Sequence, residues 1–252
     1  MIRAEKIYKS FGSQPVLNGI DFIFEAGKTN LVIGKSGSGK TVLLKILVGL
    51  FQPTSGDVWY DDINLVACDK ATLRKLRMQV GMLFQGNALF DSMTIEENIR
   101  FPLDMFTMMT VKEKTARVNN CLERVSLAGI NKKFPSEISG GMQKRVGIAR
   151  AIVLKPKYLF CDEPNSGLDP KTSITIDNLI QDITKDNHIT TIINTHDMNS
   201  VMEIGENICL LDAGVLAWQG SKDEVLQDKN EVLHDFIFAS PFLQKIIETI
   251  KK

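Results

Sequence analysis

The sequence predicts an α/β fold with a parallel central sheet, an antiparallel β part at the N-terminus and an inserted helical part. Three observations support this prediction. Short apolar segments alternate with helix-like segments from residue 141 to residue 211, which is typical of βαβ units. Two segments rich in Ile, Val and Phe open the chain with a turn between them, and residues 86–135 combine many Met and Phe residues with helical periodicity.

The N-terminal elements follow from periodicity and from Gly and Pro positions. Residues 2–8 and 16–24 are expected to pair as antiparallel strands around a turn at 12–15. The apolar run 31–33 ends at Gly34, as expected of a buried strand. A helix is expected at 41–50, ended by Pro53 and Gly56. The remaining elements expected here are a strand at 56–60, a short charged helix at 69–77 and a strand at 80–85.

The second half of the chain alternates regularly. Residues 111–125 have helical spacing with charges on one side and belong to the predicted helical part. The elements expected after it are helices at 141–154, 171–185 and 197–204 and strands at 157–162, 189–194 and 207–211. A turn at 212–214 then leads into a last strand at 215–218.

Composition narrows the function classes. The chain has 252 residues, 44% of them hydrophobic and 24% charged, which excludes a disordered or collagen-like chain. Thirty Lys and Arg balance thirty Asp and Glu, so a dedicated nucleic-acid binder, which needs an excess of cations, is not expected. The four cysteines lack the paired spacing of a zinc site or disulfide framework and are predicted to be free and mostly buried.

The N-terminal residues contain no apolar segment of the kind found in signal peptides. The most apolar window, residues 42–51, is too short to span a bilayer. We therefore expect a soluble, cytoplasmic chain.

The strongest chemical motif fits the pattern G-x-x-x-x-G-K-[ST] and follows a predicted strand. Its residues are Gly34, Lys35, Ser36, Gly37, Ser38, Gly39, Lys40 and Thr41. Glycines let successive backbone N–H groups face phosphate oxygens, and the following helix N-terminus favours an anion. Lys40 is expected to reach the β- and γ-phosphates and the Thr41 hydroxyl to bind Mg²⁺. The alternative, a flexible Gly/Ser turn, does not account for the strand before the motif and the helix after it.

Two carboxylates, Asp162 and Glu163, end a second apolar strand. Ligands of open α/β sheets bind at the carboxyl ends of the strands. Asp162 is expected to hold Mg²⁺ directly or through water, and Glu163 to polarise an attacking water. Alone, this pattern also fits a strand that ends in solvated charges.

A helix is expected to start at Ser139, Gly140 and Gly141, because Ser139 is a good N-cap and paired glycines admit an anion. Along the chain, the phosphate loop comes first, this helix start second, and the pair Asp162 and Glu163 third. In this order, the chain resembles the ATP-binding-cassette (ABC) ATPases, a class of P-loop NTPases, along nearly its whole length. The resemblance implies that Ser139 to Gln143 form the signature motif. The family's usual Leu and Gln are replaced by Ile138 and Met142, whereas the residues that meet phosphate are kept.

The resemblance also implies roles for four other residues. Phe11 corresponds to the aromatic residue that stacks on adenine, with Phe in place of the usual Tyr. Gln85 corresponds to the Q-loop glutamine, which belongs to the catalytic and Mg²⁺-binding set, Asp169 to the D-loop aspartate and His196 to the switch histidine. Lys40 and Glu163 complete the implied catalytic set.

The family resemblance predicts the larger organisation. Residues 1–230 are expected to form the ABC ATPase domain, with a helical subdomain at about 86–155, and residues 231–252 an amphipathic tail. Two copies are expected to pack head to tail with ATP and Mg²⁺ between them, so that one chain holds half of each site. The implied partner is an integral-membrane permease, which places the ATPase on the cytoplasmic face of the inner membrane.

The segment around Gln85 resembles the Mla/MCE-type lipid transporter ATPases. It reads ALFDSMT at 88–94, then EN at 97–98 and FPL at 101–103. This resemblance implies phospholipid transport and an MCE-domain protein in the complex. A regulatory ABC ATPase of the cell-division type, or another importer or exporter, is the alternative. The apolar residues between Phe101 and Met109 either contact the permease or fill the helical subdomain.

The tail has apolar residues at helical spacing on both sides of Pro241. An amphipathic helix needs a surface to cover it. Packing against its own domain is the favoured interpretation, and crossing to the partner ATPase subunit is the alternative.

Overall fold

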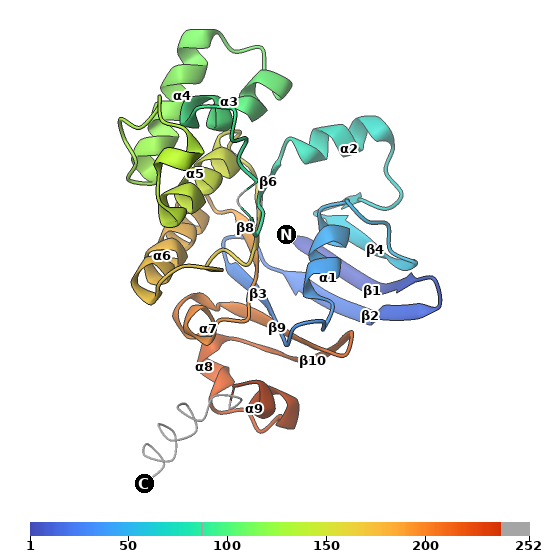
Figure 1. The fold of residues 1–252 in the computed structure, drawn as a ribbon. Coiled ribbons are helices and arrows are strands. Elements are labelled where there is room, and N and C mark those ends of the chain that lie inside the picture. The colour runs from blue at the N-terminus through green and yellow to red at the C-terminus, as the bar shows by residue number, and fades with distance from the viewer. Residues whose placement is uncertain (87, 238–252) are drawn as a thin grey trace.

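The centre of the fold is a largely parallel sheet with strand order β10-β9-β3-β8-β7-β6 (Figure 1). The structure is a computed structural model that describes residues 1–86 and 88–237. The strands are β3 (Thr29–Ile33), β6 (Val80–Leu83), β7 (Tyr158–Asp162), β8 (Thr190–Asn194), β9 (Asn207–Asp212) and β10 (Val215–Gly220). All pairs are parallel except β10 with β9. The predicted α/β class and parallel core are therefore confirmed.

The N-terminal strands form a separate antiparallel sheet with the order β2-β1-β4-β5. Its strands are β1 (Ile2–Phe11), β2 (Gln14–Phe24), β4 (Ser55–Tyr60) and β5 (Ile63–Asn64). The predicted antiparallel pair is confirmed, but the predicted turn at 12–15 is too long. Phe11 pairs with Gln14, so Gly12 and Ser13 alone make the turn, and Gly12 has a φ of +58°.

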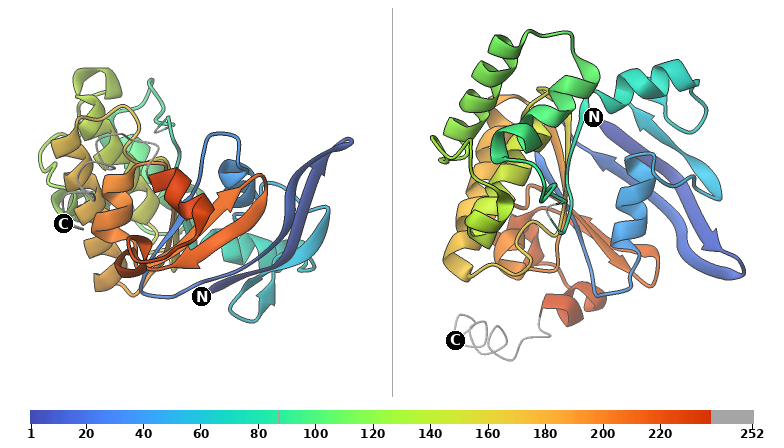
Figure 2. Two further views of the ribbon diagram at one scale, coloured as in Figure 1. Left: turned by 90° about the horizontal axis from the view of Figure 1, so that it is seen from below. Right: turned by 45° about the horizontal axis from the view of Figure 1, so that its top comes forward.

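Helix α1 (Lys40–Leu47) lies between the two sheets (Figures 1 and 2). Its buried Leu and Ile side chains pack against the N-terminal sheet and against one face of the central sheet, which includes Val32. Leu31 and Ile33 point to the opposite face, as the two-residue period of a strand requires. The helix ends before residue 50 because Gly49 takes a φ of +73° and the Leu50 amide bonds back to the Lys45 carbonyl, 2.8 Å away.

The other face of the central sheet is covered by α5 (Gly140–Ile152), α6 (Pro170–Asp186) and α7 (Met198–Ile204). Two short helices follow, α8 (Lys222–Val225), which was not predicted, and α9 (Glu231–Ile237). Leu233 and Ile237 are buried against their own chain, so the favoured interpretation of the tail is confirmed for α9. The rest of the predicted tail, residues 238–252, lies outside the described residues.

The inserted helices lie on the side of the central sheet away from the N-terminal strands (Figure 2). They are α3 (Ile95–Phe106), α4 (Val111–Arg124), the 3₁₀ turn Pro135–Glu137 and α5. The sequence did not predict α3, which contains Pro102. Its start is fixed by a capping box, in which Thr94 and Glu97 satisfy each other's backbone N–H groups. Helix α2 (Lys70–Arg77) belongs to the other side, beside β4.

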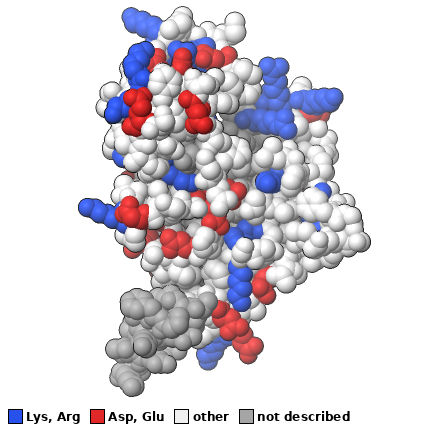
Figure 3. Space-filling view, viewed as in Figure 1, with Lys and Arg blue, Asp and Glu red and all other residues white. Residues whose placement is uncertain are grey.

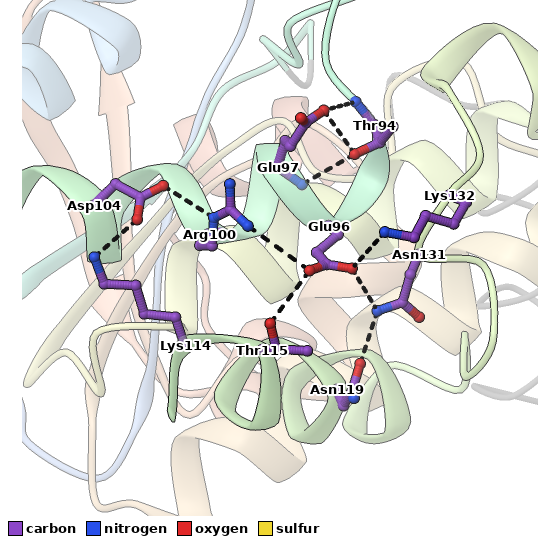
Figure 4. Close-up of polar contacts among 10 residues, drawn as sticks. All are labelled: Thr94, Glu96, Glu97, Arg100, Asp104, Lys114, Thr115, Asn119, Asn131 and Lys132. Atoms are coloured by element: carbon purple, nitrogen blue, oxygen red, sulfur yellow. Dashed lines mark hydrogen bonds and ion pairs between the residues drawn. The ribbon is translucent and has the colours of Figure 1, made fainter. Parts of the chain in front are cut away.

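Glu96 connects α3 to its neighbours (Figure 4). Its carboxylate accepts hydrogen bonds from Thr115 of α4 and from Asn131, each at 3.4 Å. Arg100 and Lys132 form ion pairs with it, at 3.8 and 3.7 Å. The side chain is only 12% exposed, so these contacts join α3, α4 and the loop after α4 into one unit.

The apolar residues at 84–109 divide between core and surface. Leu103 is buried and Met109 packs against the same core. The exposed members are Phe84, Phe90, Met105, Phe106 and Met108. Some residues of this segment therefore fill the core, whereas contact of the exposed ones with a permease stays a prediction.

Two expectations from composition can be checked directly. Cys121, Cys161 and Cys209 are buried and Cys68 is half-buried, and all four are free thiols, as predicted. In residues 1–86 and 88–237, no helix is long and apolar enough to cross a bilayer.

Candidate active site

A pocket of about 750 Å³ opens at the carboxyl ends of the parallel strands. The four segments that follow β3, β6, β7 and β8 contribute Lys40, Gln85, Glu163 and His196 to it. The full lining is Val16, Gly34, Lys35, Ser36, Gly37, Gly39, Lys40, Thr41, Val42, Gln85, Glu163, His196 and Phe236. Residues predicted from separate motifs thus meet at one edge of the sheet.

The glycine-rich loop has the shape of an anion site. Gly34, Gly37 and Gly39 have φ values of +147°, +81° and +103°. A Cβ at Gly34 would lie 2.2 Å from the Leu211 carbonyl oxygen, so no larger residue fits there. Helix α1 begins without a side-chain cap, which leaves its first N–H groups to a ligand. The Ser38 hydroxyl is buried without a hydrogen-bond partner, so the loop fits a phosphate group.

Lys40 carries its charge into this loop. Its side chain is only 7% exposed, and its ammonium donates to the carbonyls of Gly34, at 2.7 Å, and Lys35, at 3.0 Å. Burial lowers the pKa of Lys40, while the charges of Glu163 and Asp162 act in the opposite direction. The cation therefore contacts the loop and interacts electrostatically with Asp162 and Glu163 at the end of β7.

Asp162 and Glu163 have different environments. Asp162 is buried and accepts a hydrogen bond from the Asn194 side-chain amide, at 3.1 Å. Glu163 lines the pocket with a φ of +49°, a conformation uncommon outside glycine, and its amide donates to the Asn194 carbonyl, at 3.0 Å. A Glu163 carboxylate oxygen lies 2.8 Å from His196 Nδ1. The pocket thus presents a carboxylate paired with an imidazole.

These groups suit a magnesium nucleotide. Mg²⁺ in nucleotide sites is usually held by one or two protein oxygens together with the phosphates and water. The Thr41 hydroxyl at the pocket and the Asp162 carboxylate beside it supply oxygens of this kind. Gln85 also lines the pocket, and the Lys144 ammonium, buried beneath it, donates to its carbonyl at 2.6 Å.

Several predicted residues lie outside the pocket lining. Ser139 caps α5 through the Met142 amide, at 3.3 Å, and the first turn of that helix begins with Gly140, which is exposed, and Gly141, which is half-buried. Asp169 caps α6, and its hydrogen bonds from Thr172 lower its pKa. The structure therefore does not bring the signature segment and Asp169 to the phosphate loop of the same chain.

Phe11 also lies outside the lining. It ends β1 with 47% of its surface exposed and meets the edge of Phe51, with ring centroids 5.7 Å apart. The Lys9 ammonium lies 5.0 Å from its centroid. One ring face is engaged by this cation in the described chain.

Sequence reasoning missed three apolar members of the pocket, Val16, Val42 and Phe236. Val16 and Val42 stand next to recognised motifs, but nothing in their own residue types marks them. Phe236 belongs to α9, far along the chain, and no local pattern predicts its place beside the loop at 34–41. Only the packing of α9 against the domain brings Phe236 to the pocket.

Comparison with known proteins identifies the family. A family model described as ABC transporter matches residues 17–166, the part of the chain that holds the phosphate loop and Glu163. The chain belongs to the ABC transporter family. It is also 38% identical over 236 residues to the probable ribonucleotide transport ATP-binding protein mkl of Mycobacterium leprae, covering 94% of this chain and 68% of that protein.

Other ABC relatives differ in the transport their names describe. Methionine import ATP-binding protein MetN 1 of Pseudomonas fluorescens is 36% identical over 242 residues, covering 94% of this chain and 72% of that protein. The chain spans about two thirds of the length of the mkl relatives and somewhat more of MetN 1. The names of these relatives therefore describe transport of different molecules, ribonucleotide and methionine.

Solved ABC cassettes have the same fold. The dimeric structure of MJ0796, a bacterial ABC transporter cassette, superposes with a TM-score of 0.81 at 30% identity, covering 88% of this chain and 99% of that one. The cbiO1 subunit of Clostridium perfringens, part of the transporter complex cbiONQ, gives 0.84 at 28% identity and covers 98% of both chains. The same MJ0796 cassette is known as a dimer with ADP and Pi. The chain is an ATPase whose cofactors are ATP and Mg²⁺.

Proposed function

We propose that two copies of this ABC ATPase bind ATP head to tail and drive lipid transport through a permease of the Mla/MCE type. The proposed dimer is supported by one observation, the absence of the signature residues from the pocket lining of their own chain. Ser139, Gly140 and Gly141 form an anion-suited helix start that does not line the pocket formed by the phosphate loop of its own chain. In a head-to-tail dimer each signature helix would close the pocket of the other copy.

In this proposal the pocket residues have distinct roles in ATP hydrolysis. Lys40 and the N–H groups of the loop at 34–41 bind the phosphates, and Thr41, Asp162 and Gln85 would hold Mg²⁺, which neutralises phosphate charge when bound. Glu163 orients the attacking water and accepts its proton. His196 fixes the Glu163 carboxylate by the 2.8 Å contact between them.

The lipid assignment is supported by the segment at 84–103, whose sequence resembles that of the Mla/MCE-type ATPases. This segment carries the exposed residues Phe84 and Phe90, and Met105, Phe106 and Met108 are exposed after it. In Figure 3 the area between the basic side chains of α2 and the charged helical part is mostly uncharged. An exposed apolar surface of this kind suits contact with a partner protein.

The test of the lipid assignment is purification from the native membrane. The ATPase should co-purify with an integral-membrane permease and an MCE-domain protein, and mass spectrometry should find phospholipid in the complex above the level in a permease control. A permease that carries no lipid, or a partner of the cell-division type, would instead support the regulatory alternative or another cargo.

The permease contact itself predicts an uncoupled variant. Phe90→Asp should abolish co-purification with the permease, because an unpaired charge buried in an interface costs several kcal/mol. Nucleotide binding should be unchanged, since Phe90 is 41% exposed and its neighbour on the surface is Phe101. Ile23→Asp, which changes an exposed apolar residue of β2, is the matched control. Co-purification of the Phe90 variant at the wild-type level would show that the contact lies elsewhere.

Leu89→Asp should also disrupt the complex, but Leu89 packs against the core of its own chain. A folding defect would therefore accompany the loss of binding in that variant. Phe90 is the cleaner site for the experiment.

Adenine stacking on Phe11 gives a second expected result. Phe11→Ala should weaken ATP and ADP binding equally, by about 1–3 kcal/mol, because both nucleotides carry the base. Isothermal titration calorimetry measures both affinities. Phe106→Ala, which removes another partly exposed ring, is the control. Unchanged affinities would assign Phe11 to packing against Phe51 and make Tyr8, 45% exposed, the candidate.

A further inference from the structure

Three polar side chains form a hydrogen-bonded cluster that involves the segments carrying Glu163 and His196. The Asn165 amide donates to Asp177 Oδ1, at 2.8 Å, and to the Ser200 hydroxyl oxygen, at 3.0 Å. The Ser200 hydroxyl donates in turn to Asp177 Oδ2, at 2.8 Å. One carboxylate of α6 thus receives a donor from the loop after β7 and a donor from α7.

Two members of this cluster, Asp177 and Ser200, are buried, and Asn165 is half-buried. Asp177 is 2% exposed and Ser200 1%, and Asp177 forms no ion pair with any residue among 1–86 and 88–237. Burial raises the pKa of Asp177 to about 6, the bonds from Ser200 and Asn165 oppose the rise, and Asp197 and Glu203 of α7 add to it. A buried carboxylate without a cation is costly, so an apolar residue would serve packing alone better.

The cluster joins the two segments that carry the pocket's carboxylate and imidazole. Asn165 lies two residues after Glu163, in a turn closed by the bond from the Ser166 amide to the Glu163 carbonyl, at 3.2 Å. Ser200 lies four residues after His196, in α7. At the front, Glu163 and His196 are 2.8 Å apart. The two segments are therefore connected twice, once by the Glu163–His196 contact and once by the hydrogen bonds of the cluster.

We propose that Asp177 is a positioning residue for ATP hydrolysis, which holds Asn165 and Ser200 on one carboxylate and so fixes the placement of Glu163 against His196. This inference rests on the proposed roles of Glu163 and His196 at ATP. Asp177 touches neither of them, so its effect is expected on the chemical step. Small displacements of catalytic groups cost about 10²-fold in rate.

The test compares variants that break the cluster with one that rebuilds it. Asp177→Asn and Ser200→Ala should each lower kcat by about tenfold to a hundredfold, with ATP affinity within about twofold of wild type. Asn165→Asp should do the same, because it places two carboxylates together. The double variant Asn165→Asp with Asp177→Asn exchanges amide and carboxylate, and should recover most of kcat. Ser173→Ala, another buried serine on α6, is the control and should keep the wild-type kcat.

The outcomes separate this inference from the proposed function. Wild-type kcat in Ser200→Ala and Asp177→Asn, while Glu163→Gln is inactive, overturns the role of Asp177 and leaves the pocket assignment intact. An equal loss in Ser173→Ala, or a matching loss of ATP affinity, indicates a general packing defect and also overturns it. If Asp177→Asn does not fold, Ser200→Ala and the exchanged double variant decide. Activity in Glu163→Gln would instead refute the proposed function.

Discussion

Glu163→Gln is expected to reduce the rate of ATP hydrolysis by about 10²–10⁴-fold while ATP binding is kept. Glutamine preserves the size of the side chain and its contact with His196, but it cannot accept a proton from water. The Lys40 ammonium and the loop at 34–41, which would bind the phosphates, are untouched. Phosphate release in steady state and calorimetric titration with a slowly hydrolysed ATP analogue measure the two effects.

The matched control is Glu123→Gln, because Glu123 is exposed on α4 and away from the pocket. It should hydrolyse ATP at the wild-type rate. Turnover near the wild-type rate in Glu163→Gln itself would show that the site built on Asp162 and Glu163 is assigned wrongly.

Lys40→Ala should have the opposite profile and lose nucleotide affinity by about ten- to a hundredfold, because a hydrogen bond to a charged group contributes about 1.5–3 kcal/mol. The variant removes the buried cation that faces both the glycine loop and the β7 carboxylates. Lys45→Ala is the control, since Lys45 lies on the same helix with its ammonium over the Phe51 ring. Unchanged affinity for MgATP and MgADP would place the phosphates elsewhere.

Local patterns predicted the regular part of the fold well. The predicted bounds of β7, β8 and α6 lie within one residue of the observed ones, because the two strands are continuous buried runs and α6 shows a clear helical period. By contrast, β3 begins two residues before its predicted start and β6 ends two residues before its predicted end. Helix α3 has no such signal, because Pro102 interrupts it and its apolar residues include the exposed Met105 and Phe106 as well as buried Ile and Leu residues. The predicted end of α1 was attributed to Pro53 and Gly56, whereas the helix ends earlier, where Gly49 adopts a left-handed backbone.

The candidate site was predictable where a motif is continuous in sequence. The loop at 34–41 and the pair after β7 are of this kind, and the pocket does contain Lys40 and Glu163. Contacts that need three distant segments were not predictable. Asp177 reads as one charged residue on a helix, and only the packing of α6 and α7 brings it to Asn165.

In the proposed function, one chain holds half of the ATP site, and ATP joins two copies. Light scattering on Glu163→Gln with and without MgATP tests it most directly, because this variant should keep ATP bound. We expect a monomer of 28.1 kDa without nucleotide and, with MgATP, a dimer of twice that mass carrying one ATP per chain. Monomers that are saturated with ATP at every protein concentration would contradict it.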